Sequence, residues 1–534
     1  MKRMLALSLA ALAGLLSIGA QAAAPGITGT STTAGTFSLI AQPAYITQPD
    51  GQSVYSWGYG CTANPPTSVF VPVMGNVTPF CTTMQVPGPT LVVTEGQTVT
   101  VTLRNNLPTA AGNTSILFPG FTLTSACPAG QQGLLTCEAP PGGSVTYTFV
   151  ASTPGTRAYY SGTQGDLQVE MGLYGAIIVV PNASNAPACP FHNPAAGIDP
   201  NAIDQTMLTG TEADFRLSST GAAYHLAQSC YDREYLFQFS EMDPNIHKQA
   251  QSQSTLTCTS CMLVPTEPYH PAYFMINGRS MPDDMDTNYA NQYQHQPYNG
   301  NPHMHPGELV LLRIIGQGRW QHPFHEHGNH VRILARDGNL ILAGTSGAAA
   351  TQLAGPLLFT TTTTPGLAMD GIFYWTGKGL NWDAYGHNPK SSDGGALLTC
   401  TADTNGYNTA VAARTRINYY EWCQDHNKPM QAAPFGDVPA GGPVTLPDSN
   451  LFTNGAWYGG SPYLGPNATT RATGPTGTTP PSGTIANSPT GEAGFAFMWH
   501  SHNEREITTN NIFPGGMLMM MLVDSREFVI DESQ

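Results

Sequence analysis

Charged residues are scarce in this chain, and basic residues are the scarcest of them. Lys, Arg, Asp and Glu make up 10% of the 534 residues, and 20 basic residues stand against 35 acidic ones, a formal net charge of −15. An acidic surface of this kind repels nucleic acids and anionic lipids, so we expect no nucleic-acid partner. Glycine-rich phosphate loops and the G-x-S-x-G turn of serine hydrolases are missing from the sequence, and neither chemistry is indicated.

Long apolar runs are missing beyond the first residues. No segment after residue 22 approaches the roughly 18–20 uninterrupted apolar residues of a membrane helix, so we expect no membrane insertion. At the start, Lys2 and Arg3 precede an apolar run over 4–18, and the small-residue site Ala20-Gln21-Ala22 follows it. This pattern predicts a signal peptide over residues 1–22. We therefore expect an exported protein, in the periplasm, on the cell surface or outside the cell.

Ten cysteines all follow the predicted signal peptide. An even number in an exported chain indicates disulfides, although the sequence leaves their connectivity open. Cys258-Thr-Ser-Cys261 also has the spacing of a metal-binding or redox pair, but a structural bridge is the preferred interpretation. Pairing neighbours along the chain joins Cys61 with Cys81, Cys127 with Cys137, Cys189 with Cys230, Cys258 with Cys261, and Cys400 with Cys423.

Glycine and proline are abundant, with 57 and 44 residues, and short β-branched segments lie between them. This rhythm is typical of antiparallel β-sandwiches, so we predict an all-β fold with long Gly/Pro-rich loops and few, short helices. We expect an N-terminal domain over 23–181, a linker over 182–229 and a C-terminal domain over 230–534. An insertion at about 380–490 is expected to hold little regular structure. The expected strands are 90–94, 97–103, 144–150, 175–181, 234–239, 273–277, 309–315, 331–334, 371–375, 495–502 and 516–523.

Two histidine clusters indicate a metal site. His325 and His327 are two residues apart, as are His500 and His502, and β-prone segments lie close before each pair. Side chains two apart on a strand point to the same face, so two such strands side by side present four imidazoles together. Imidazole is the commonest biological ligand of copper, zinc and non-haem iron.

Several segments resemble the multicopper oxidases, a family built from cupredoxin domains. Residues 85–107 are similar to the opening strands of that family's first domain, and 172–180 to the strand that closes it. The segment 322–328 reads H-P-F-H-E-H-G and matches the family motif H-P-x-H-x-H-G. Residues 500–502, His-Ser-His, stand where the family carries His-Cys-His. The resemblance implies two cupredoxin-like Greek-key β-sandwich domains and copper as the metal.

The chain departs from the family at the first-domain ligands. That domain supplies four histidines to a trinuclear copper cluster, and the matching positions here are Leu117, Pro119, Tyr160 and Gly162. Leucine and proline side chains have no atom that binds copper. The resemblance therefore implies that a complete trinuclear cluster is absent.

The family's blue, type 1 copper is expected to be missing as well. That site needs a cysteine thiolate and two histidines. Ser501 stands at the cysteine position and Glu506 at one histidine position, which leaves His322. Because side chains alternate along a strand, Ser501 is expected to face His322 and Glu506, away from His500 and His502. A second, weaker metal site at His322 and Glu506 stays open.

The surviving ligands are predicted to be His325, His327, His500 and His502, which hold one copper ion, with Glu506 as the candidate catalytic proton acceptor. These residues favour an exported copper-dependent oxidoreductase that acts on a small molecule or a metal ion. The alternatives are a non-catalytic copper-binding or metal-tolerance protein and a metal-free structural cupredoxin.

A second candidate copper site is His303-Met304-His305, which offers two imidazoles and a thioether. Whether the protein forms a homo-oligomer is left open by the sequence.

Overall fold

The computed structural model describes residues 24–72, 77–189, 221–378, 400–409, 421–424, 460–464, 493–524 and 530. The predicted signal peptide and most of the predicted linker and insertion lie outside these ranges, so the expectations for them stay predictions. Within the described residues, no helix has the length and apolar character needed to cross a membrane.

The N-terminal part of the chain forms two β-sheets. Their strands are β1 (Gly26–Ile27), β2 (Thr36–Thr47), β3 (Ser53–Cys61), β4 (Phe70–Val71), β5 (Leu91–Thr94), β6 (Thr98–Asn105), β7 (Ser144–Val150), β8 (Gly155–Tyr160) and β9 (Tyr174–Val180). One sheet has the order β4-β1-β5-β9-β8, and the other β3-β2-β6-β7. In β6, buried residues alternate with less buried ones, as expected for a strand with one face on a core. The two sheets share a core that includes Trp57, Val101, Tyr147 and Ile177.

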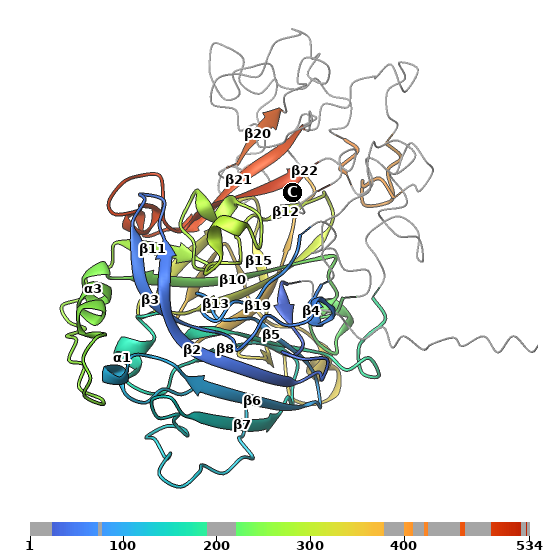
Figure 1. The fold of residues 1–534 in the computed structure, drawn as a ribbon. Helices are drawn as coiled ribbons and strands as arrows, with labels where there is room; N and C mark the ends of the chain where they lie inside the picture. The colour runs from blue at the N-terminus through green and yellow to red at the C-terminus, as the bar shows by residue number, and fades with distance from the viewer. Residues whose placement is uncertain are drawn as a thin grey trace, which may run out of the picture.

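The C-terminal part forms two further sheets (Figure 1). Their strands are β10 (Arg233–Met242), β11 (Tyr273–Ile276), β12 (His303–Met304), β13 (Leu309–Gly316), β14 (His322–Glu326), β15 (Val331–Arg336), β16 (Asn339–Leu340), β17 (Leu357–Leu358), β18 (Thr360–Thr363), β19 (Ala368–Tyr374), β20 (Gly460–Leu464), β21 (Ala493–Ser501) and β22 (Leu518–Asp524). One sheet runs β11-β10-β13-β19-β15-β16 with β17 beside β15, and the other β12-β22-β21-β14-β18 with β20 beside β21. Phe237, Phe324, Trp499 and Met519 are among the residues that fill the core of this part.

Helices in the described residues are short. The longest is α3 (Pro244–Gln253), whose first turn is capped by Asp243, because its carboxylate accepts from the Asn245 N–H at 2.9 Å. The others are α1 (Gly165–Gln168) and the 3₁₀ turns η1 (Thr67–Val69), η2 (Thr109–Ala111), η4 (Ala227–Ser229), η5 (Asp283–Met285), η6 (Asn291–Tyr293), η7 (Gly347–Thr351) and η9 (Glu504–Ile507).

The predicted β-rich fold is confirmed, with three differences. The sheets are mixed, because the pairs β2 with β6, β5 with β9 and β10 with β13 run parallel, so the expectation of antiparallel sheets was wrong at these pairs. β2 and β3 were not among the expected strands. Within the insertion, β20 pairs with β21, a regular element that the Gly/Pro-rich composition did not indicate. The number of domains and their boundaries stay predictions.

Polar and apolar contacts join the N-terminal and C-terminal parts. The Thr156 N–H and hydroxyl both donate to the Asp370 carboxylate, at 3.1 and 2.6 Å. Arg313, which is fully buried, donates to the Thr156 hydroxyl at 3.0 Å. Ala176 and Leu236 lie in an apolar cluster that contains residues of both parts. The four sheets therefore pack as one body.

All ten cysteines form disulfides, and every pair is the nearest neighbour in the chain. The structure thus gives the disulfide connectivity that the sequence left open. Cys258 and Cys261 form a bridge with each other, as either a structural or a redox-active pair would.

Candidate metal site

The two histidine segments meet on neighbouring strands. β14 and β21 pair antiparallel, with His325 opposite His500 and Phe324 opposite Ser501. Side-chain alternation then separates two faces of the strand pair. Phe324 and Ser501 are fully buried on the inner face, toward the core. His325 and His500 lie on the outer face, and we call His325, His327, His500 and His502 the histidine cluster.

The four imidazoles of the histidine cluster are mutual neighbours. The ring centroid of His325 lies 4.6 Å from that of His327, 4.9 Å from that of His502 and 5.6 Å from that of His500. The Nε2 atoms of His327 and His500 are 3.3 Å apart. Two nitrogens that each lie about 2.0–2.1 Å from one tetrahedral ion are separated by about 3.3–3.4 Å. This nitrogen pair therefore has the spacing of two ligands of a single ion.

Hydrogen bonding fixes the tautomer of His500. Its Nδ1 lies 2.7 Å from the carbonyl oxygen of Ser501, and a carbonyl only accepts, so Nδ1 carries the hydrogen. In the neutral ring, Nε2 then has its lone pair directed at His327. Burial lowers the pKa of His500, and burial followed by the neighbouring histidine charges lowers the pKa of His325 to about 3. Both rings are therefore neutral at neutral pH, the form that binds metals.

The histidine cluster opens to solvent on one side. His325, His327 and His500 are buried, whereas the His502 side chain is 51% exposed. Phe359, which is 37% exposed, lies with its ring 5.7 Å from that of His325. A small ligand would therefore approach past His502 and Phe359.

The arrangement is not a finished coordination shell. Within the part of the chain that the structure describes, no group of three or more His, Cys, Asp or Glu side chains is placed to hold a metal ion as it stands. His327 and His500 account for two ligands, and a third requires one of the other rings to turn. The exposed side chain of His502 has room to do so.

His322 lies on the inner face, away from the histidine cluster. Its Nδ1 is 2.8 Å from Oε2 of Glu506, and its Nε2 is 2.9 Å from Oε2 of Glu241. All three side chains are buried. Burial alone lowers the pKa of His322, but the hydrogen bonds and charges of the two carboxylates outweigh it and raise the pKa to about 9. We call Glu241, His322 and Glu506 the buried triad, an imidazolium held between two carboxylates.

Glu506 is likewise directed inward. It accepts from the Ser501 hydroxyl at 2.5 Å and from Nδ2 of Asn503 at 2.8 Å, besides its contact with His322. The structure thus brings His322, Ser501 and Glu506 together, as side-chain alternation predicts. Both nitrogens of His322 face carboxylates, which leaves neither for a metal, and Glu506 lies on the opposite side of the sheet from the histidine cluster.

Sequence reasoning missed Glu241. The expected strand 234–239 ends two residues before it. In the structure β10 continues to Met242, and Glu241 also accepts from the backbone N–H groups of Arg319 and Trp320, at 2.7 and 2.9 Å. The apolar alternation of Phe-Gln-Phe-Ser over 237–240 breaks at Glu241, so the local pattern gave no signal for this residue.

Three of the first-domain positions where the family has histidines lie together. Leu117 and Tyr160 pair in an isolated β-bridge, and a Cβ atom at Gly162 would lie 2.8 Å from Cγ of Leu117. The missing side chain of Gly162 therefore makes room for that of Leu117. The absence of a trinuclear cluster still rests on the resemblance and stays a prediction.

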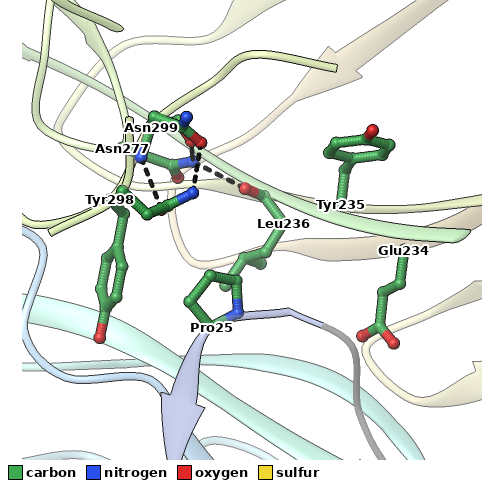
Figure 2. A pocket seen from close by; sticks show the side chains of 8 residues that line it. Pro25, Glu234, Tyr235, Leu236, Asn277, Tyr298 and Asn299 are labelled. Atoms are coloured by element: carbon green, nitrogen blue, oxygen red, sulfur yellow. Dashed lines mark hydrogen bonds between the residues drawn. The ribbon is translucent and has the colours of Figure 1, made fainter. Parts of the chain in front are cut away.

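The second candidate site lies elsewhere on the same sheet. His303 and Met304 form β12, which pairs with β22 and is separated from β14 by two strands. A small cavity also lies apart, between the start of β1 and strand β10 (Figure 2), lined in part by Pro25, Leu236 and Asn277. At about 10 Å³ it has room for about one water molecule and is too small for a substrate.

Comparison with known proteins supports the resemblance in the N-terminal part. Residues 73–184 match the family model described as multicopper oxidase. This segment is similar to the multicopper oxidases. An L-ascorbate oxidase of Brassica rapa subsp. pekinensis is 38% identical over 96 residues, 18% of this chain and 16% of the relative. Laccase-3 of Botryotinia fuckeliana is 33% identical over 113 residues, 21% of this chain and 23% of the relative.

The matches cover only part of each relative. The chain spans less than a quarter of the length of these two curated proteins. Among solved structures, a blue copper oxidase from Nitrosomonas europaea is 14% identical, covers 92% of this chain and 85% of that chain, and has a TM-score of 0.41.

Proposed function

We propose that this protein is an exported copper-dependent oxidoreductase related to the multicopper oxidases, with a reduced site formed by the histidine cluster. The observation that carries the proposal is the meeting of four imidazoles on β14 and β21, with Nε2 of His327 and His500 3.3 Å apart. The family match over residues 73–184 supports copper as the metal. Five disulfides support export to an oxidising compartment. We take the four sheets to be two cupredoxin-like sandwiches.

The donor set fits copper. Neutral imidazoles bind Cu(II) more tightly than the other first-row divalent ions. The carboxylate of Glu504 lies 3.3 Å from Nδ1 of His502, at the solvent side of the cluster. A bound copper ion would supply a one-electron redox change and an open coordination position for a small-molecule or metal-ion substrate. In this proposal His327 and His500 hold the ion and His502 closes the shell from the solvent side. Glu506, on the far face, acts by fixing the end of β21 through Ser501.

Metal content and spectroscopy test the proposal. Protein purified from an exporting host and loaded with Cu(II) is expected to bind about one ion, with a weak type 2-like electron paramagnetic resonance signal and no intense blue band. The double variant H327A/H500A should lose stoichiometric binding. The matched control H303A/H305A, on the same sheet, should keep it. Binding that follows His303 and His305 instead, or an intense blue band in the unmodified protein, would contradict the ligand assignment.

Two alternatives have specific support. Three of the four rings are buried, which favours retention of copper without turnover, as in a copper-binding or metal-tolerance protein. No three ligand side chains among the described residues are already placed around one ion, which favours a metal-free structural cupredoxin. Oxidation of phenols, Fe(II) or Mn(II) by the copper-loaded protein, lost in H327A/H500A, would separate the enzyme from both. Copper bound without turnover would identify the carrier, and no bound copper the scaffold.

A further inference from the structure

One disulfide differs from the other four in its surroundings. Cys258 and Cys261 are three residues apart, whereas the other pairs are separated by 10 to 41 residues. All ten cysteines lie in the described residues, and Cys258 is the only one that is exposed. Exposed disulfides exchange with thiols more readily than buried ones, and a short ring contributes little to stability. This bridge is therefore accessible to thiols and contributes little to the stability of the fold, as expected for an exchangeable disulfide.

The backbone around the ring is both uncovered and anchored. Leu256 is 42% exposed and Leu263 is 82% exposed, so the chain on either side of the ring leaves it open to solvent. Behind the ring, Met262 is buried in the N-terminal core, and its N–H donates to the Ala110 carbonyl at 2.9 Å. Opening the disulfide would therefore leave the loop attached to the N-terminal part.

The ring also holds a strained residue. Ser260 has a φ of +54°, in the left-handed region that residues other than glycine rarely adopt. Its N–H donates to the Thr109 carbonyl at 3.2 Å, a contact that keeps it in this conformation. Because this hydrogen bond does not depend on the disulfide, it can hold the loop in place when the bridge is opened.

We propose that Cys258–Cys261 is a thiol–disulfide exchange site that accepts two electrons from a dithiol. One thiolate of the dithiol attacks Sγ of Cys258, the exposed residue of the pair, which forms a mixed disulfide and expels Cys261 as a thiolate. The first sulfur of the dithiol is now bonded to Cys258. The second thiol of the dithiol attacks this first sulfur and expels Cys258 as a thiolate. Both protein thiolates take up the two protons released by the dithiol, which leaves as its disulfide.

The two cysteines have different roles in this reaction. Cys261 is half-buried against the N-terminal core, so an attacking thiol reaches Cys258 first. Sγ of Cys261 lies 3.1 Å from the carbonyl oxygen of Cys258, so the thiol formed at Cys261 has an acceptor within reach. The exchange is independent of the histidine cluster and of any bound metal.

Graded reduction of the folded full-length protein tests the site. The protein is treated with increasing dithiothreitol, alkylated with iodoacetamide and mapped by mass spectrometry, while circular dichroism monitors the fold. Cys258 and Cys261 should be alkylated together at a concentration that leaves the other eight cysteines unmodified and the spectrum unchanged. Alkylation of another pair at the same or a lower concentration would overturn the proposal, as would no alkylation before the protein unfolds.

Single variants test which sulfur is attacked. C261S leaves the thiol of Cys258, and the matched variant C258S leaves that of Cys261. With oxidised glutathione, C261S should form a mixed disulfide about tenfold faster than C258S, because its thiol is the exposed one. Equal rates would overturn the assignment of Cys258. The double variant C258S/C261S should fold and should resist alkylation at low dithiothreitol. Failure of this variant to fold would identify the bridge as a structural disulfide and overturn the proposal.

Discussion

The two faces of the β14–β21 pair treat histidine in opposite ways. On the outer face, burial and neighbouring rings lower the pKa of His325 to about 3, and the imidazoles stay neutral. On the inner face, two carboxylates raise the pKa of His322 to about 9, and the ring is a cation. The same residue type on the same strand, three positions apart, is thus a metal-ligand candidate on one face and a buried charge on the other. The neighbours of an imidazole, rather than the motif that contains it, decide its chemistry.

The inner face also shows how a histidine can be buried without a metal. His322, Ser501 and Glu506 come together, as side-chain alternation predicts, and Glu241 completes the group. The positive charge of the imidazolium lies between the two carboxylates, where it offsets their burial. The buried triad therefore ties β10, β14 and η9 together through charge-assisted hydrogen bonds, with no metal required.

The largest expected effect is the conversion of the inner face into a copper site. The double change S501C/E506H introduces a thiolate and an imidazole beside Nδ1 of His322, which gives the Cys-His-His set of a blue site. Glu241, on Nε2 of His322, would orient that ring from behind. Adding H327A/H500A removes the outer ligands. The resulting quadruple variant should acquire an intense visible absorption on addition of Cu(II). The control H327A/H500A alone should stay colourless, and a colourless quadruple variant would show that the inner face does not have this geometry.

Removal of the buried cation should be the most destabilising single change. H322A leaves Glu241 and Glu506 buried without the charge between them, and loss of one partner from such a group costs about 3–5 kcal/mol. The free energy of unfolding from urea titration, followed by circular dichroism, measures the effect. The neutral replacement E241Q/H322Q/E506Q should recover a large part of the loss. If H322A costs less than about 1 kcal/mol, the imidazolium is not a major electrostatic contributor.

Glu170, a buried acid, should make the protein less stable as the pH rises, in the same sense as His322, because the folded-state pKa of each group is raised. Burial raises the pKa of Glu170 to about 8, although the Asp243 N–H and the Tyr269 hydroxyl both donate to it at 2.6 Å. The folded pKa lies above the unfolded one, so the contribution of Glu170 is fully present below the ordinary glutamate pKa of 4.5 and is lost as the pH rises toward 8. The free energy of unfolding of E170Q should therefore rise, relative to that of the unmodified protein, by about 1 kcal/mol per pH unit between pH 5 and 8.

Urea titrations of both proteins at several pH values measure this difference. E241Q is the matched control, because Glu241 accepts from two backbone N–H groups and from His322, and its loss should destabilise the protein instead. A constant difference between E170Q and the unmodified protein would mean that Glu170 is ionised in the folded state.

Local features were predictable from the sequence, and long-range partners were not. Two H-x-H steps on β-prone segments predict imidazoles on one face of a strand, and His325 and His500 meet in this way. The charge on His322 depends on Glu241, 81 residues away in the chain, which nothing in the local pattern connects to it. Parallel pairs such as β2 with β6 also depend on connections between sheets rather than on local pattern. The nearest-neighbour disulfides followed the simplest pairing because each loop brings its own ends together.

The smallest expected effect is in the N-terminal part, where the side chain of Leu117 packs against Gly162. A methyl group at Gly162 would lie 2.8 Å from Cγ of Leu117, so G162A should cost about 1 kcal/mol, because the half-buried leucine can shift partly out of the way. In an L117A background, the same change should cost almost nothing. A coupling of about 1 kcal/mol in this double-mutant cycle, measured by urea unfolding, would establish that the two positions share one packing space. Additive effects would mean that Leu117 and Gly162 do not share a packing space.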